Sequence, residues 1–305
     1  MKIFALVITY NRSKSLEKAM KRLLSQKRKA DEIVIINNCS TDNTSELLKN
    51  YQNDAHIFNL NQNTGGAGAY YFGLNQCVKM GADWIIGVED DIILPKNHIL
   101  HIEQTIKSQN FSEIGFIYPK VISIHDRYKL DGFLYYKNQI TTEYPRLLKA
   151  QFAGLSFNAN AIKKVGLPIH SFFIYYDDWE YTERMNRHGF EGIHTPNLYV
   201  WHNDVKRSDG SPYLHAPYNG IWKSYYGIRN ELTYLKNHHF KTYCFQLMKH
   251  VFWIPLITLL KRKDHAANVA FNWAFWSFKS IFKTLQIDYV NDSNTKAFEK
   301  RFLGK

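Results

Sequence analysis

Three consecutive acids, Glu89, Asp90 and Asp91, follow an apolar run that predicts a buried strand at 84–88. Side chains alternate across an extended strand, so Glu89 and Asp91 would face one side and Asp90 the other. Two carboxylates on one side supply the hard oxygen ligands that Mg²⁺ or Mn²⁺ prefers. An isolated acidic triplet is more often a solvated turn, but its position directly after a buried strand favours the metal site.

A glycine-rich segment, NTGGAG at 63–68, precedes a predicted helix. Gly65 and Gly66 would let the backbone approach a phosphate closely, and the start of a helix favours anions. With Asn63 they form a candidate diphosphate-binding turn. The spacing matches neither the Walker A motif nor the full dinucleotide fingerprint, so a plain turn is the alternative.

A second acidic pair, Asp177 and Asp178, follows an aromatic run and stands at a predicted helix start. Either acid could serve as a general base whose pKa is raised by partial desolvation against the aromatic side chains. The alternative is structural: Asp177 would cap the helix, and Asp178 with Glu180 would compensate the helix dipole. Farther along, His202 ends the segment VWH, and it could complete a metal site only if it approaches Asp91.

Strands and helices are expected to alternate through the first 90 residues. The expected strands are 4–9, 33–36, 56–58 and 84–88, and the expected helices are 16–24, 43–51 and about 65–80. The second helix has Asn43 and Glu46 at the spacing of a capping box. This alternation predicts right-handed βαβ units and a mostly parallel, Rossmann-like sheet.

Polar clusters follow each expected strand, at 10–12, 37–42, 63–68 and 89–91. Ligands of such sheets bind beyond the carboxyl ends of the strands, so we expect these clusters to meet at one crevice. Thereafter the pattern is less regular, with short strands expected at 114–118, 151–157 and 191–194 and a helix starting near Asp177. We expect one α/β domain over residues 1–217 and a helical extension over 218–305.

The composition fits this division, with 305 residues, 45% hydrophobic residues and a net charge of +12. A basic surface favours phosphorylated substrates, nucleic acid or anionic lipid. Cys39, Cys77 and Cys244 are too few and too scattered for a disulfide framework or a zinc site, which favours a reducing cytoplasm. The first residues predict a strand rather than a signal peptide.

The extension is aromatic and basic, and three interpretations remain open for it. It could pack as core or as a dimer surface, lie on an anionic membrane, or bind nucleic acid; no recognition pattern supports the last, so no nucleic-acid partner is expected. Lys249, His250 and Pro255 argue against a helix that spans the membrane.

Several segments together resemble the family 2 inverting glycosyltransferases of the GT-A fold. They are VITYNR at 7–12, IINNCSTD at 35–42, NTGGAG at 63–68 and EDD at 89–91. The resemblance covers about the first 200 residues. VGLP at 165–168, DDWEY at 177–181, VWH at 200–202 and YYGIRN at 225–230 are similar to the galactofuranosyltransferase branch.

This resemblance implies a UDP-sugar donor, a divalent metal and transfer with inversion. By position, Glu89, Asp91 and His202 match the metal-binding residues, Asp90 matches the middle acid near the ribose or diphosphate, and Asp178 matches the proposed base. The nucleotide would be held by the segments that contain Thr9, Tyr10, Arg12 and Asn38. Two positions depart from the family pattern: Asn37 replaces a common Asp, and Glu89 replaces the commoner first Asp.

The expected reaction is galactofuranosyl transfer to a cell-surface glycan or its lipid-linked precursor at the cytoplasmic membrane face, by a peripheral protein that could form a homo-oligomer. A rhamnosyl- or galactopyranosyltransferase of the same fold is the nearest alternative. A basic lipid- or nucleic-acid-binding protein without catalysis is an alternative of another class.

Overall fold

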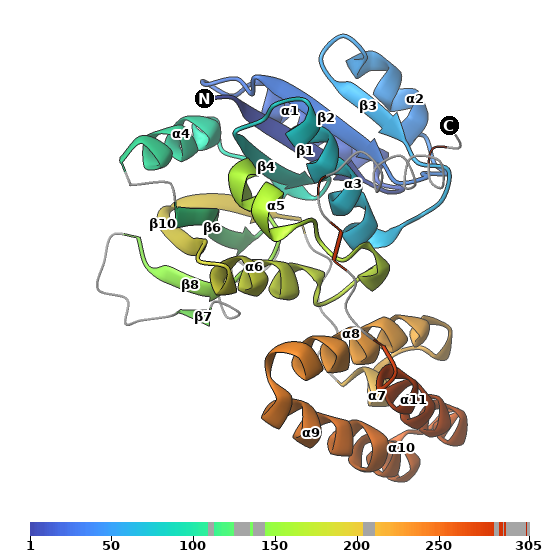
Figure 1. The fold of residues 1–305 in the computed structure, drawn as a ribbon. Coiled ribbons are helices and arrows are strands. Elements are labelled where there is room, and N and C mark those ends of the chain that lie inside the picture. Colours follow the sequence, from blue (N-terminus) through green and yellow to red (C-terminus); the bar gives the residue numbers. More distant parts are fainter. Residues whose placement is uncertain are drawn as a thin grey trace. The chain divides into compact units, whose positions relative to one another are not determined.

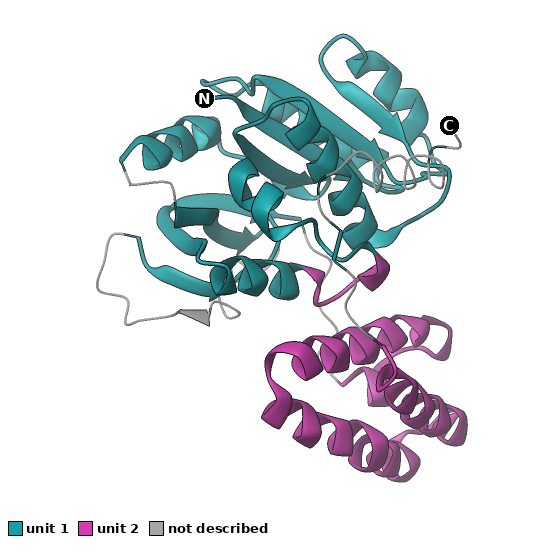
Figure 2. Ribbon diagram, viewed as in Figure 1, with its two compact units in different colours: residues 1–170, 178–206, 287–305 teal, residues 171–177, 207–286 magenta. Residues whose placement is uncertain are grey.

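The computed structural model describes residues 1–108, 113–124, 135–136, 144–203, 211–283, 287–288, 290 and 303 (Figure 1). The chain divides into two compact units, coloured separately in Figure 2. Unit 1 comprises residues 1–170, 178–206 and 287–305, and unit 2 comprises residues 171–177 and 207–286. Asp177 is therefore assigned to unit 2 and Asp178 to unit 1.

The first half of unit 1 is a parallel sheet in the order β3-β2-β1-β4. Its strands are β1 (Ile3–Thr9), β2 (Glu32–Asn37), β3 (His56–Asn59) and β4 (Trp84–Glu89), joined by α1 (Ser13–Leu24), α2 (Thr44–Leu48) and α3 (Gly65–Lys79). All seven residues of β1 are buried, which explains its unbroken apolar run. The predicted alternation of strands and helices is confirmed.

The predicted capping box at the start of α2 is wrong. Asn43 makes no side-chain capping bond, and Asp42 Oδ1 instead accepts a hydrogen bond from Thr44 N at 3.0 Å. Asp42 thus bonds the first amide of the helix from two residues before it, in the manner of an Asx turn. The helix expected to reach residue 51 ends at Leu48 and tightens into a 3₁₀ turn over Lys49–Tyr51.

The second half of unit 1 extends the sheet in the order β4-β9-β6-β10-β8-β7. Its elements are β5 (Ile92–Ile93), α4 (His98–Ser108), β6 (Ile114–Ser123), β7 (Tyr135–Tyr136), β8 (Arg146–Lys149), β9 (Ser156–Asn158), α5 (Ala159–Val165), α6 (Asp177–Arg187) and β10 (Glu191–His202). β10 runs parallel to β6, whereas β9 is antiparallel to both β4 and β6. The predicted mostly parallel sheet with flanking helices is thus found, although its second half also contains antiparallel pairs.

The strand predicted at 151–157 is wrong over most of its length. Leu155 N donates to Phe152 O at 3.0 Å, and Gly154 has a φ of +70°, so a turn occupies the first five residues. The strand begins only at Ser156. The apolar residues of this turn are buried, which gives it the composition of a strand.

Unit 2 is helical, as expected for the extension. It contains α7 (Pro212–His215), α8 (Trp222–His238), α9 (Phe240–Met248), a π-helical turn (Lys249–Trp253), α10 (Ile254–Lys261) and α11 (Ala266–Ser280). Its small core gathers buried side chains from α8, α9, α10 and α11: Ile228, Leu232, Tyr234, Leu235, Tyr243, Ile254 and Trp273. The aromatic extension is thus partly core.

A buried polar chain crosses this small core. His250 Nδ1 accepts a hydrogen bond from Trp273 Nε1 at 3.0 Å, and its Nε2 lies 3.2 Å from Glu231 Oε2. Because the indole nitrogen only donates, His250 must carry its proton on Nε2 when neutral and donate it to Glu231. These bonds fix the π-helical turn against α8 and α11.

Candidate active site

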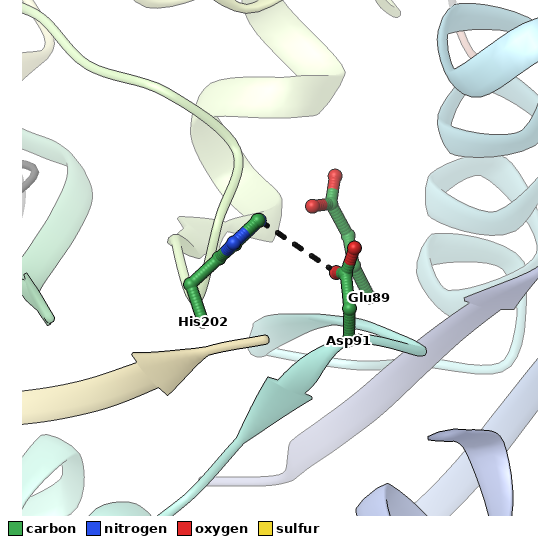
Figure 3. A group of neighbouring side chains, drawn as sticks. All are labelled: Glu89, Asp91 and His202. Carbon is green, nitrogen blue, oxygen red and sulfur yellow. Dashed lines mark ion pairs between the residues drawn. The ribbon is translucent and has the colours of Figure 1, made fainter. Parts of the chain in front are cut away.

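Glu89, Asp91 and His202 form a compact cluster in unit 1 (Figure 3). One ligand atom from each lies within 4.8 Å of the others, and Asp91 Oδ1 is 3.7 Å from His202 Nε2. Glu89 ends β4, Asp91 lies in the turn that follows, and His202 ends β10. Side chains more than a hundred residues apart in the sequence therefore point toward one another.

The pairing of β5 with β10 explains how they meet. β5 begins immediately after Asp91, and its antiparallel register places Ile92 opposite His202. The backbone turns at Asp90 and Asp91 instead of remaining extended, which differs from the geometry assumed for the sequence. The turn nevertheless leaves Glu89 and Asp91 facing the same space, with Asp90 bonded elsewhere.

The cluster has the chemistry of a divalent-cation site. It offers two carboxylates and one imidazole, a donor set suited to Mg²⁺ or Mn²⁺. Within the part of the chain that the structure describes, the buried atom Asp91 Oδ1 accepts no hydrogen bond. A buried carboxylate oxygen is costly to leave unsatisfied, so a bound cation would relieve this cost.

Arg12 lies beside the acids and compensates their charge. Its Nη1 bonds Asp91 Oδ2 and lies 3.3 Å from Asp90 Oδ1. About half of the Arg12 side chain remains exposed, so it can reach solvent or a ligand without leaving the acids. A positive charge therefore already lies beside the two acids.

Asp90 connects the end of β4 to the loop after β1. Its Oδ2 accepts hydrogen bonds from Thr9 Oγ1 at 2.9 Å and from Tyr10 N at 3.1 Å. Burial raises the pKa of Asp90 to about 6, although the Arg12 guanidinium opposes this shift. The carboxylate therefore holds the loop after β1 in place, and the Tyr10 side chain remains exposed.

Asn38 joins the loop after β2 to the glycine turn. Its Oδ1 accepts from Thr64 N at 2.8 Å and from Thr64 Oγ1 at 2.9 Å, while its Nδ2 donates to Asn63 Oδ1 at 3.1 Å and to Gly65 O at 3.0 Å. Every polar atom of this buried amide is used. The glycine turn is thus held by a side chain from the loop after β2.

The glycines of this turn serve different purposes. Gly65 has a φ of +70°, which other residues rarely adopt. A Cβ on Gly68 would lie 2.5 Å from Thr64 Cβ, so the helix can approach Thr64 only with glycine there. A Cβ on Gly66 would meet nothing within 4 Å. Packing does not require this glycine, and the backbone beside it is accessible to a ligand at the start of α3.

Asp178 lies in the first turn of α6, where Trp179 N donates to its Oδ1 at 2.8 Å. Burial raises the pKa of Asp178 to about 6, and the hydrogen bond from Trp179 N and, less strongly, the charge of Lys149 oppose this shift. Three residues join α6 to β10, so the helix runs back along the sheet. The start of α6 and the end of β10, with Asp178 and His202, therefore lie toward the same edge of unit 1.

The rest of α6 is fixed by a buried ion pair. Arg184 Nε donates to Glu180 Oε1 at 2.8 Å, and the guanidinium also donates to Val165 O at 2.7 Å and Leu167 O at 3.0 Å. Glu180, which the sequence offered as a dipole-compensating acid, is bonded to Arg184 inside the protein. Such a fully hydrogen-bonded pair holds the helix in one position.

Comparison with known proteins decides the family. Residues 4–166, more than half of the chain, match the family described as glycosyl transferase family 2. The chain belongs to glycosyl transferase family 2. The resemblance drawn from the four segments is therefore confirmed at the level of the family.

This family 2 glycosyltransferase is 25% identical over 201 residues to the galactofuranosyltransferase GlfT1 of Mycobacterium tuberculosis. The match covers 61% of the chain and 65% of that protein, which is less than two thirds of its length. The fold is similar to that of S. aureus TarS 1–349 in complex with UDP, with a TM-score of 0.60, 15% identity and coverage of 92% and 81% of the two chains.

A third protein shares the fold of this family 2 glycosyltransferase. GalNAc-T7 with UDP, GalNAc and Mn²⁺ has a TM-score of 0.61 and 12% identity, with coverage of 92% of this chain and 56% of that chain. At such identities the likeness shows the GT-A fold alone. The sheet and its flanking helices thus have the GT-A arrangement.

Three bonded groups account for most residues predicted for the site. Glu89, Asp91 and His202 form the first, Thr9, Tyr10, Arg12 and Asp90 the second, and Asn38, Asn63 and Gly65 the third. The second group is joined to the first through Arg12 and Asp91. The predicted acids Asp177 and Asp178 are the first two residues of α6.

Sequence reasoning included Asn11 in the cluster at 10–12 but gave it no role of its own. Its φ is +54°, and its Oδ1 accepts hydrogen bonds from Thr41 N at 2.6 Å and Asp42 N at 3.3 Å. Asn11 therefore ties the loop after β1 to the loop after β2. An asparagine directly after a strand, where left-handed backbone is common, was the available signal.

Proposed function

We propose that this protein is a metal-dependent, inverting glycosyltransferase that transfers galactofuranose from a UDP-sugar to a hydroxyl group of a glycan. The observation that carries the proposal is the meeting of Glu89, Asp91 and His202 at the carboxyl end of the sheet. The galactofuranosyltransferase among its relatives favours the furanose donor. Arg12 and the amides at the start of α3 would receive the diphosphate.

The proposed metal is Mn²⁺ or Mg²⁺, held by Glu89, Asp91 and His202. When bound, it would supply Lewis-acid neutralisation of the charge that develops on the departing diphosphate. Arg12 would add a second positive charge at the same place, because its guanidinium already contacts Asp91. Metal titration of the variant Glu89→Asp tests whether Glu89 contacts the cation directly or through water.

Asp178 is proposed as the general base. With a pKa raised to about 6, its carboxylate is ionised at neutral pH yet more basic than an ordinary aspartate. It would take the proton of the acceptor hydroxyl while that oxygen attacks the anomeric carbon from the face opposite UDP. One displacement then forms the glycosidic bond, breaks the bond to UDP and inverts the anomeric centre.

A panel of nucleotide sugars with detection of released UDP tests the donor. We expect turnover to be fastest with UDP-galactofuranose, to require a divalent cation, and to stop in Asp178→Asn. Turnover only with UDP-galactopyranose or a rhamnosyl donor would refute the galactofuranosyl assignment. Salt-sensitive nucleic-acid binding without affinity for UDP would instead favour the non-catalytic alternative.

We further propose that unit 2 places the enzyme on the cytoplasmic face of a membrane, where a lipid-linked glycan would serve as acceptor. Many large apolar side chains of its last three helices and the π-helical turn are at least half exposed: Phe240, Phe245, Met248, Phe252, Trp253, Leu259, Leu260, Phe271, Phe275 and Phe278. Exposed apolar side chains in such number favour a membrane or a protein partner.

The charges of the same helices favour a membrane. Between residues 240 and 283 there are six lysines, Lys241, Lys249, Lys261, Lys263, Lys279 and Lys283, and the single acid, Asp264, pairs with the buried Arg262. Each lysine near an anionic leaflet contributes roughly 1 kcal/mol of attraction. By length and composition Phe240–Lys261 could cross a membrane, but its His250 is buried against Glu231 and Trp273, which favours a helix lying at the surface.

Vesicle flotation tests this placement. We expect the protein to bind vesicles of anionic phospholipid and to lose binding in the double variant Phe245→Glu, Leu260→Glu. The control is Leu148→Glu, which charges an exposed apolar residue of unit 1. Undiminished vesicle binding by the double variant would contradict the proposal, and concentration-dependent dimerisation that the same variant abolishes would favour a homo-oligomer.

A further inference from the structure

The loop that leads into α6 has an unusual backbone. Phe173, Tyr175 and Tyr176 have φ angles of +64°, +70° and +65°, a left-handed conformation that costs energy for any residue with a Cβ. Three such residues within four positions persist only when their surroundings impose them. The loop ends one residue before Asp178.

Asn230 supplies the main restraint. This residue is completely buried on α8, and its Nδ2 donates to Phe172 O at 2.8 Å, Ile174 O at 2.9 Å and Tyr175 O at 2.8 Å. The two hydrogens of one side-chain amide are thus shared among three carbonyls of the left-handed loop. Loop residues 171–177 and α8 both belong to unit 2, so the restraint lies within one unit.

Arg229 orients that amide and adds bonds of its own. Its Nε donates to Asn230 Oδ1 at 2.9 Å, which turns the NH₂ group of Asn230 toward the loop. Its Nη2 donates to Phe172 O at 3.2 Å and also to Ser171 O. Its guanidinium lies 4.9 Å from the ring centre of Tyr226, on which Phe173 stacks at 4.8 Å.

We propose that Arg229 and Asn230 are positioning residues that hold the strained loop so that Asp178 is presented correctly as the base. This inference rests on the proposed function. The body of α6 is fixed within unit 1 by Arg184, whereas the loop that enters its first turn is fixed within unit 2 by Arg229 and Asn230. Without them, the left-handed residues would relax and redirect the chain immediately before Asp178.

The first test compares Asn230→Ala with Asn237→Ala. Asn237 lies on the same helix, and its Nδ2 donates to Thr233 O of that helix at 2.7 Å. It is the control because this bond does not reach the loop. We expect Asn230→Ala to lower kcat at least 10-fold and to move the acidic limb of the pH profile, while affinity for UDP with Mn²⁺ changes less than twofold. Equal kcat in the two variants would overturn the proposal.

A second test separates positioning from general damage. Tyr175 is nearly half exposed, so Tyr175→Gly removes left-handed strain with little loss of packing. In the Asn230→Ala background, Tyr175→Gly should restore part of the lost kcat, because the loop no longer resists its conformation. A double variant no faster than Asn230→Ala, with normal UDP affinity, would show that strain in this loop does not govern Asp178.

Hydrogen exchange provides a readout that does not require activity. Amides of residues 173–178 should exchange at least 10-fold faster in Asn230→Ala than in the wild type, and Arg229→Lys should show a smaller increase. Unchanged exchange would overturn the restraint itself. If the amides exchange faster in Asn230→Ala but the wild type consumes no nucleotide sugar, the restraint stands. The proposed function and the catalytic part of this inference are then refuted.

Discussion

Replacing Asp178 by Asn should stabilise the protein while stopping turnover. The folded-state pKa of Asp178 is about 6, against an ordinary value of 3.8, because burial disfavours the ionised form. The folded protein therefore binds a proton more tightly than the unfolded chain, and stability is lost as pH rises from about 4 to about 6. Asn removes that loss and keeps an oxygen to accept the hydrogen bond from Trp179 N.

The magnitude follows from the shift. About two pKa units correspond to roughly 3 kcal/mol at neutral pH, and partial exposure of the carboxyl reduces the expected gain to about 1–3 kcal/mol. The same substitution should lower kcat by roughly 100-fold or more, the usual contribution of a general base. In the wild type, kcat/KM should rise with pH up to about 6 and then level off.

Urea denaturation at pH 7.5 and below pH 4 measures the stability, and released UDP measures turnover. The variant should be more stable than the wild type only at pH 7.5, whereas the exposed control Asp54→Asn should change nothing. Equal or lower stability of Asp178→Asn at pH 7.5 would refute desolvation of this carboxylate. Near-normal kcat would show that Asp178 is not the base.

Two further perturbations test other parts of the structure. Gly66→Ala should leave the melting temperature unchanged, because a Cβ there meets nothing within 4 Å, but it should weaken UDP binding measured by calorimetry. Gly68→Ala should lower both the melting temperature and the affinity for UDP, because its Cβ would lie 2.5 Å from Thr64 Cβ. Equal effects of the two would contradict this division. Trp273→Phe should destabilise unit 2 by about 1–3 kcal/mol, because it leaves His250 Nδ1 without its hydrogen-bond donor. Trp253→Phe, at an exposed position, should leave the stability unchanged. Thermal denaturation of the two variants measures the difference.

Local sequence predicted the first half of the sheet because its central strands β1, β2 and β4 are short apolar runs that are buried on both faces. Local sequence predicted poorly where buried apolar residues form a turn instead of a strand. Residues 151–155 are apolar and buried yet form a turn at Gly154, and Asp42 rather than Asn43 bonds the first amide of α2.

The candidate site was predictable in its residue types but not in its assembly. Strand ends placed the acids and the glycine turn at one edge, and only the resemblance linked His202 to them. The physical cause, the antiparallel pairing of Ile92 with His202, joins residues too distant for local patterns to reveal. The restraint of the left-handed loop by Asn230 is likewise a tertiary contact, which the segment YYGIRN alone could not show.

Calorimetric titration of UDP with and without Mn²⁺, on the wild type and on Asp91→Ala, tests the central claim most directly. Asp91 contributes the buried oxygen that lies 3.7 Å from His202 Nε2, so its removal should eliminate the metal-dependent part of UDP binding and leave only weak, metal-independent affinity. Metal-dependent UDP binding of wild-type strength in Asp91→Ala would contradict the proposed metal and diphosphate site.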